Sequence, residues 1–136
     1  MTTERNTLGQ LLPIVPDSWL GSKPEYYIYR AILRRGLREG IDFQYQRNVF
    51  GGRTNRGGVI ADFFIFVPRV GINVQGRFFH EKRIRADQMQ RSALEVSGIR
   101  MEFISEEEAA IRPDAAVTEA ILGTRGRGPA EALRGI

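Results

Sequence analysis

The chain has no cysteine and a single histidine, His80, among its 136 residues. The missing cysteines exclude disulfides, thiol catalysis and cysteine-ligated zinc, and they are consistent with a reducing compartment. One histidine excludes metal sites built from several imidazoles, and any Ser-His-Asp triad would have to use His80. No apolar run is long enough to span a membrane, and the first residues lack the basic-then-apolar pattern of a signal peptide. We therefore expect a cytoplasmic protein without membrane contacts.

Lysine is also scarce, because only Lys23 and Lys82 stand among the 20 basic residues and the others are arginines. The formal net charge at pH 7 is +4, and the isoelectric point is about 10.0. Guanidinium groups bind phosphate in a bidentate manner, so this balance favours a nucleic-acid partner. The alternative is that the preference for arginine reflects the composition of the genome.

The most apolar stretch of the chain, residues 57–80, contains one acidic residue, Asp62. Val, Ile and Phe dominate its first half, which indicates a buried strand around Val59–Ile65 at the centre of a sheet. A buried carboxylate costs several kcal/mol unless a cation or hydrogen-bond donors meet it. Asp62 is therefore either a functional group or a structural carboxylate that backbone amides satisfy, and both interpretations stay open.

A second strand is predicted from Ile72 to Arg77, after a turn at residues 68–71. Alternation places the apolar Ile72 and Val74 on one face of this strand. The opposite face then carries Asn73, Gln75 and Arg77. If the two strands are neighbours, Asp62, Gln75 and Arg77 can meet at one polar site, and an ordinary solvated face is the alternative.

A helix is predicted from Ser22 onward. Ser22 is a suitable N-cap, Pro24 lies in the first turn, and Glu25 has the spacing of a capping box. Helical spacing also places Glu25 on the same face as the apolar Ile28, Tyr29 and Ile32. Glu25 is therefore either a capping carboxylate or a group that reaches Asp62 from a helix packed on the sheet. The opposite face carries Arg30, Arg34 and Arg38.

The remaining segments complete a mixed sheet. A strand is predicted over residues 41–50, and the glycine-rich loop 51–58 follows, in which Arg53 and Arg56 either contact phosphates or form a solvated hairpin tip. A helix over 81–97, a strand over 99–105 and short helices after 105 and over 114–122 come next. This order predicts an α/β fold with a mixed sheet of about four strands flanked by helices. We divide the chain into an arm, 1–21, a domain, 22–112, and a helical and basic tail, 113–136.

With these residues placed, the chain resembles the PD-(D/E)XK nuclease superfamily, in particular single-domain proteins similar to very-short-patch repair endonucleases. The resemblance covers roughly residues 22–105 and rests on the order and spacing of the elements. It implies a restriction-endonuclease-like three-layer fold in which Glu25 is the helix carboxylate and Asp62 the metal-binding aspartate. The other matching residues are Gln75, Gly76, Arg77 and His80 at the strand end, and Arg91, Leu94 and Gly98 in the following helix-to-strand signature.

The strand end departs from the family pattern, because Gln75 and Arg77 stand where the family has an acid and a lysine. An amide oxygen can still bind a hard cation beside Asp62 and Glu25, although it supplies no charge. Arg77 stays protonated and can stabilise charge on a phosphate. The resemblance leaves Lys82 to substitute for the missing lysine and His80 to protonate a leaving oxygen or orient water.

The resemblance implies a DNA endonuclease that hydrolyses phosphodiester bonds with Mg²⁺ or Mn²⁺. Glu25, Asp62 and Gln75 would hold the metal, and Arg30, Arg34, Arg53 and Arg56 would contact DNA. The alternative is a catalytically degenerate nuclease-fold protein that binds DNA or builds a nucleoprotein assembly, as a homodimer or within a larger complex. A purely structural protein–protein module is the third interpretation.

Overall fold

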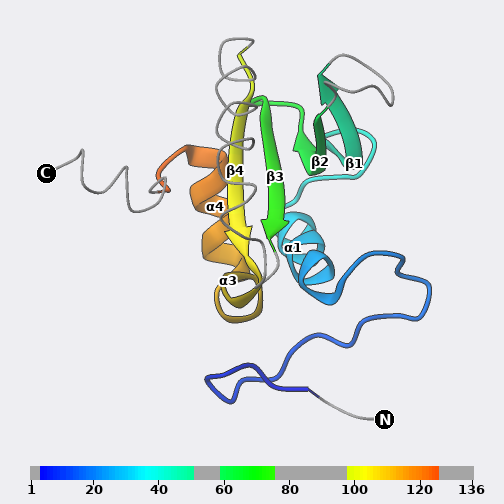
Figure 1. Ribbon diagram of the computed structural model, residues 1–136, viewed down its shortest axis with the longest axis vertical. Coiled ribbons are helices and arrows are strands. Elements are labelled where there is room, and N and C mark those ends of the chain that lie inside the picture. Colours follow the sequence, from blue (N-terminus) through cyan, green and yellow to red (C-terminus); the bar gives the residue numbers. More distant parts are fainter. Residues whose placement is uncertain (1–3, 51–58, 76–97, 126–136) are drawn as a thin grey trace, which may run out of the picture.

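The computed structural model describes residues 4–50, 59–75 and 98–125 (Figure 1). In chain order the elements are α1 (Lys23–Arg34), β1 (Phe43–Phe50), β2 (Val59–Ile65), β3 (Val70–Gln75), β4 (Arg100–Ser105), α3 (Glu106–Ile111) and α4 (Pro113–Leu122). The strands form one sheet in the order β1-β2-β3-β4. Neighbours are antiparallel from β1 to β3, and β3 is parallel to β4. The predicted α/β class with a four-stranded mixed sheet is confirmed. The predicted loop 51–58 and helix 81–97 lie outside the described residues.

Helix α1 begins with the predicted capping box. The Ser22 hydroxyl accepts a hydrogen bond from the Glu25 amide, and the Glu25 carboxylate accepts one from the Ser22 amide. These reciprocal bonds satisfy two amides that the helix start leaves without intrahelical partners. The helix buries Ile28 and Ile32 completely, as the apolar stripe predicts. The capping box thus fixes the position of the Glu25 carboxylate at the N-terminus of α1.

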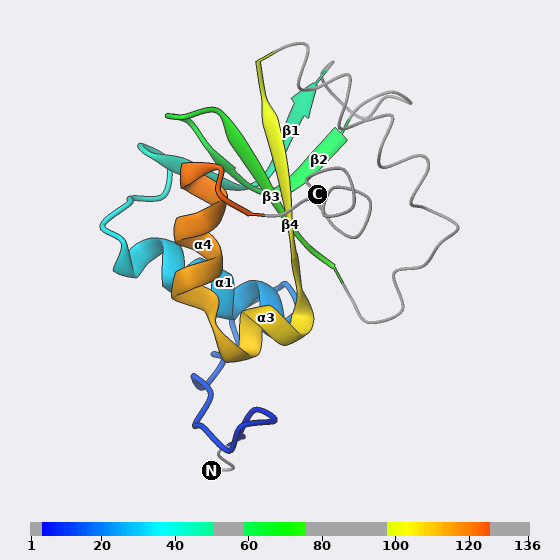
Figure 2. The same cartoon turned by 90° about the vertical axis from the view of Figure 1, so that its left-hand side faces the viewer.

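The three described helices all pack on one face of the sheet (Figure 2). There the apolar face of α1 meets Phe43, Phe63 and Ile72 of the first three strands, and α4 adds Ala116, Val117 and Ala120. The segment expected as a tail therefore supplies part of the core. On the opposite face, Ala61, Phe64, Ile99 and Met101 form a second buried cluster. Within the described ranges no helix has the length and apolarity that a membrane span requires.

Strand β1 begins two residues later than predicted. Residues 38–42 form a turn in which Asp42 Oδ2 accepts a hydrogen bond from the Arg38 amide at 2.8 Å, and the Gly40 amide donates to the Phe43 carbonyl at 2.6 Å. The amides of Ile41 and Asp42 both donate to the Arg38 carbonyl, at 3.2 and 2.8 Å, so neither is left for a strand ladder. Ile41 is consequently 60% exposed and does not extend the apolar alternation of Phe43 and Tyr45.

The N-terminal arm lies against the helices. The Asn6 side chain donates a hydrogen bond to the Ala110 carbonyl of α3 at 2.9 Å, and Leu12 and Val15 pack against the core. Trp19 contacts the aromatic side chains of α1 and β1, with ring centroids 5.0 Å from Tyr29 and 4.9 Å from Tyr45. The arm is thereby fixed to the start of α1, where Glu25 is located.

Candidate carboxylate site

Asp62 lies where the ladder between β2 and β3 ends. The backbone pairs run from Ile65 with Val70 to Phe63 with Ile72. Asp62, the next residue of β2, has no backbone pair on β3. Two side chains bridge the strands there. The Asp62 amide donates to Asn73 Oδ1 at 2.7 Å, and the Val74 amide donates to Asp62 Oδ2 at 2.7 Å. One oxygen of Asp62 is therefore satisfied by a backbone amide, which is the structural role that the sequence left open.

The N-terminal turn of α1 brings the Glu25 carboxyl group beside Asp62, close enough for its charge to act on that group. Burial raises the pKa of Asp62 to about 6, the Val74 amide opposes this rise, and the charge of Glu25 raises the pKa further. Two ionised carboxylates repel one another at short range, so Asp62 keeps its proton to a higher pH than an isolated aspartic acid does. Glu25 therefore both caps the helix and reaches Asp62.

Glu25 is also held from the sheet. Its Oε1 atom accepts a hydrogen bond from the Tyr45 hydroxyl at 2.7 Å in addition to the one from the Ser22 amide at 3.2 Å. Burial and this bond to Glu25 raise the pKa of Tyr45, which therefore stays a donor. Sequence reasoning assigned no role to Tyr45 or Asn73. The available signal was the alternation of Phe43 and Tyr45, which directs both rings to the same face as α1.

No hydrogen bond joins Gln75 to Asp62 or Glu25 among the described residues. Gln75 lines a hollow of about 580 Å³ at the ends of β3 and β4, together with Ser105 and residues of α3 and the arm. The described contacts of Asp62 are instead with Asn73, Val74 and Glu25. Among the residues that the structure describes, no three acidic or histidine side chains gather as metal ligands. Arg77, His80 and Lys82 lie outside the described residues.

The arginines of α1 that were predicted to contact DNA differ in their surroundings. Arg34 Nε is 2.9 Å from Asp114 Oδ1 on α4. Arg30 is exposed, and its guanidinium has no ion-pair partner in the described part of the chain. Arg53 and Arg56 lie outside the described residues. Among the described arginines that were predicted to contact DNA, Arg30 is the one whose guanidinium is not engaged in an ion pair.

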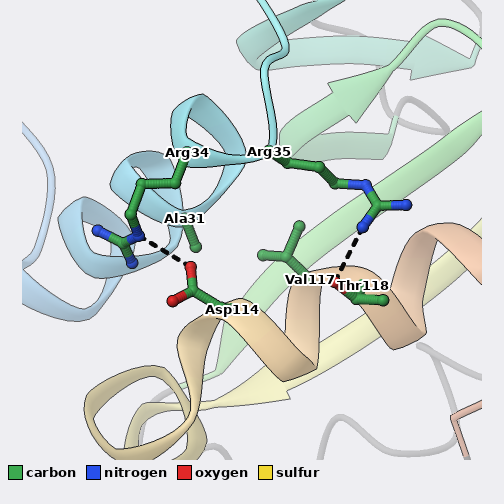
Figure 3. A pocket seen from close by; sticks show the side chains of 6 residues that line it. All are labelled: Ala31, Arg34, Arg35, Asp114, Val117 and Thr118. Atoms are coloured by element: carbon green, nitrogen blue, oxygen red, sulfur yellow. Dashed lines mark hydrogen bonds and ion pairs between the residues drawn. The ribbon is translucent and has the colours of Figure 1, made fainter.

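A hollow of about 330 Å³ separates the end of α1 from α4, with Ala31 and Val117 on its floor (Figure 3). Arg34 and the adjacent Arg35 extend to opposite sides of it, toward Asp114 and Thr118. Both hydrogen bonds are 2.9 Å long, and they join the two helices. The side chains of Arg34 and Asp114 are 42% and 67% exposed, so this ion pair contributes about 1 kcal/mol or less.

The pKa of Asp62 predicts how stability changes with pH. Because the pKa rises from 3.8 to about 6 on folding, the folded chain binds the extra proton, and its stability falls between these pH values as the pH rises. Asp62→Asn does not ionise, and its amide can donate to Glu25 while its oxygen still accepts from Val74. In metal-free buffer we expect Asp62→Asn to be more stable than wild type by about 1–3 kcal/mol above pH 6.5 and by much less near pH 4.

Urea unfolding at several pH values measures this difference. Asp42→Asn is the matched control, because the hydrogen bond that the Arg38 amide donates to the Asp42 carboxylate lowers the pKa of Asp42. That carboxylate stabilises the fold above its ordinary pKa, so its replacement should act in the opposite direction. A stability gain in Asp62→Asn that is constant from pH 4 to pH 7.5 would contradict the raised pKa of Asp62.

No protein-family model matches the sequence, and neither a curated protein nor a solved structure shows significant similarity to the chain.

Proposed function

We propose that the protein is a divalent-metal-dependent nuclease of the PD-(D/E)XK type that hydrolyses phosphodiester bonds in DNA. The observation that carries this proposal is the pair of neighbouring carboxyl groups of Glu25 and Asp62, which come from two different elements and are partly buried. Two neighbouring carboxylates form a place that a cation can occupy, because the cation removes the repulsion between the two charges.

The chemistry of the two side chains fits Mg²⁺ or Mn²⁺. Known hydrogen bonds occupy Oε1 of Glu25 and Oδ2 of Asp62, and no backbone or tyrosine donor reaches their other oxygens within the described segments. Mg²⁺ is commonly held by one or two carboxylates while it keeps several waters. Bound at this pair, the ion would polarise a phosphodiester and lower the pKa of an attacking water.

The chain's other residues supply charge and protons in this proposal. Arg77 stabilises negative charge on the phosphate, since its guanidinium stays protonated and binds phosphate oxygens in a bidentate manner. His80 or Lys82 gives a proton to the leaving oxygen. Gln75 is the weakest member of the set, because its described surroundings are those of the hollow beside α3.

A second candidate function is DNA binding without cleavage. It is favoured by the absence of a third acidic ligand beside Glu25 and Asp62 among the described residues. A nuclease-fold protein with two carboxylates and a basic composition could serve as a structural component of a nucleoprotein assembly. The two candidates share a DNA partner and differ only in whether the bound strand is cut.

A cleavage assay separates them. The full chain is incubated with supercoiled, linear and branched DNA in Mg²⁺, in Mn²⁺ and in EDTA, beside Asp62→Ala purified in the same way. A nuclease should cut at least one form in a metal-dependent manner, and Asp62→Ala should bind DNA at least as tightly without cutting it. Absence of cleavage that depends on Asp62, on every form and in both metals, would contradict the nuclease and leave the binding function.

Exposed arginines predict how DNA binding responds to salt. Arg30→Ala removes one cation that can neutralise a phosphate, so the slope of log affinity against log salt should become less steep by about 1. Binding should weaken equally on unrelated sequences, because phosphate contacts carry no base information. Arg69→Ala, an exposed arginine in the turn between β2 and β3, is the control. Fluorescence anisotropy over a salt series measures both, and an unchanged slope for Arg30→Ala would exclude this residue from the interface.

A further inference from the structure

The Glu25 carboxylate is fixed by donors on a single one of its oxygens. Oε1 accepts from the Tyr45 hydroxyl at 2.7 Å and from the Ser22 amide at 3.2 Å. The Gln46 side-chain amide donates to the same tyrosine oxygen at 3.2 Å. The Tyr45 oxygen therefore accepts from Gln46, and the proton of the Tyr45 hydroxyl points toward Glu25. The bonds hold Oε1 and leave Oε2 free of these donors.

The backbone of β1 is distorted beside this contact. Gln46 has a φ of +56°, in the left-handed region that residues other than glycine seldom adopt. In the register of β1 and β2, Tyr45 faces Phe63 and Arg47 faces Ala61, so Gln46 lies level with Asp62 but is not among the paired residues. A left-handed residue costs of order 1 kcal/mol, and such distortions are retained where surrounding contacts require them. Here the distortion accompanies the bond from Gln46 to the Tyr45 hydroxyl.

The N-terminal arm closes the other side of Tyr45. Trp19 packs against the Tyr45 ring, and its Nε1 donates to the Ser22 carbonyl at 2.9 Å. A Cβ atom at Gly21 would overlap both the Tyr45 hydroxyl and Glu25 Oε1, and it would lie 3.0 Å from Trp19 Nε1. Only glycine lets the arm approach this hydrogen bond so closely. Two separate parts of the chain thus enclose the same pair of oxygens.

We propose that Tyr45, packed against Trp19 and Gly21, is a positioning residue that directs Glu25 Oε2 toward a divalent cation shared with Asp62. This inference rests on the proposed function in one respect, namely that a cation binds between the two carboxylates. Tyr45 itself does not touch the cation. It acts by restricting the rotation of Glu25, so the arm forms a wall of the metal site.

Hydroxyl removal tests the proposal with a matched control. Tyr45→Phe deletes the donor to Glu25 and keeps the ring beside Trp19. Tyr29→Phe deletes a hydroxyl of the same aromatic cluster, one that is 2.9 Å from Oε1 of another carboxylate, Glu39. Loss of a group that orients a metal ligand typically costs 10- to 100-fold in affinity, so we expect Tyr45→Phe to weaken Mn²⁺ binding by about tenfold. Tyr29→Phe should change it by less than about twofold, because its hydroxyl orients no proposed ligand.

Terbium luminescence reports the coordination directly. Trp19 is the only tryptophan, and its position beside Tyr45 suits it to sensitise Tb³⁺ bound at the carboxylate pair. Emission lifetimes in H₂O and D₂O count the waters on the ion. If Glu25 loses its orientation in Tyr45→Phe, about one additional water should replace it. A purely structural role would lower the melting temperature and leave this number unchanged.

Gly21→Ala provides an independent test from the arm. Its added methyl should separate Tyr45 from Glu25, so the loss from Tyr45→Phe should be smaller in the Gly21→Ala background than in wild type. Equal Mn²⁺ affinity and equal hydration in folded wild type and Tyr45→Phe would overturn the positioning role while the metal site stands. Failure of wild type to bind Mn²⁺ or Tb³⁺ would contradict the proposed function and the positioning role together.

Discussion

Phe63→Ala is expected to lower the free energy of unfolding by about 3–5 kcal/mol, a large share of the stability of a domain of this size. Phe63 is completely buried, and its ring lies 5.1 Å from Tyr45, 6.4 Å from Tyr29 and 6.5 Å from Phe43. Truncation therefore removes aromatic contacts with β1 and with α1 at once. Phe63 also follows Asp62 in β2, so the core and the site share this strand.

Chemical unfolding followed by the fluorescence of Trp19 measures this loss. Phe66→Ala is the control, because Phe66 is only half-buried and packs beside Phe64 on the opposite face of the sheet. Its truncation should cost clearly less, since a side chain near the surface leaves a smaller cavity. Similar losses for both variants would contradict the assignment of Phe63 to the centre of the core.

Asp62→Asn and Glu25→Gln are each expected to lower metal-dependent DNA cleavage by at least about 100-fold. Each change keeps the shape of the side chain and removes one negative charge from the proposed cation site. An amide oxygen attracts a divalent cation much more weakly than a carboxylate does. The double variant should lose little more activity than either single variant, because one substitution alone already prevents the pair from holding the ion.

The carboxylates of Glu39 and Asp42, in the segment between α1 and β1, serve as controls for this experiment. Glu39 accepts a hydrogen bond from Tyr29, and Asp42 is paired with Arg38, so both resemble the site residues in chemistry without facing Asp62. Glu39→Gln and Asp42→Asn should therefore keep cleavage within about twofold of wild type. Initial rates on the preferred DNA form provide the comparison, and a loss of similar size in a control would point to stability instead of metal binding.

The elements that local patterns specify could be predicted from the sequence. Val59–Ile65 is a strand as expected, and it is an interior strand of the sheet. The capping box of Ser22 and Glu25 forms as predicted, and the Ser105 hydroxyl caps α3 by accepting a hydrogen bond from the Glu108 amide. Both caps depend on residues three apart in sequence, and the strand depends on a continuous apolar run. Such features are decided by neighbours along the chain.

The contacts of the site were only partly predictable. Strand alternation and helix spacing allowed Glu25 and Asp62 to meet, but they did not show that Asn73 bonds the Asp62 amide and that Val74 donates to Asp62 Oδ2. Those bonds arise because the ladder between β2 and β3 stops at Phe63, and no local pattern marks that point. The role of Arg34 was similarly hidden. Its partner, Asp114, is 80 residues away and reaches it only after α4 packs on α1.

Direct measurement of Mn²⁺ binding tests the central claim, that Glu25 and Asp62 together form a divalent-cation site. Isothermal titration of the full chain at pH 7.5 should give one strong site, and Asp62→Asn should remove it while Asp42→Asn keeps it. Affinity in wild type should also fall as the pH is lowered through about 6, because the ion competes with the proton that Asp62 binds below its raised pKa. Absence of binding in wild type, or equal binding in wild type and Asp62→Asn, would contradict the claim.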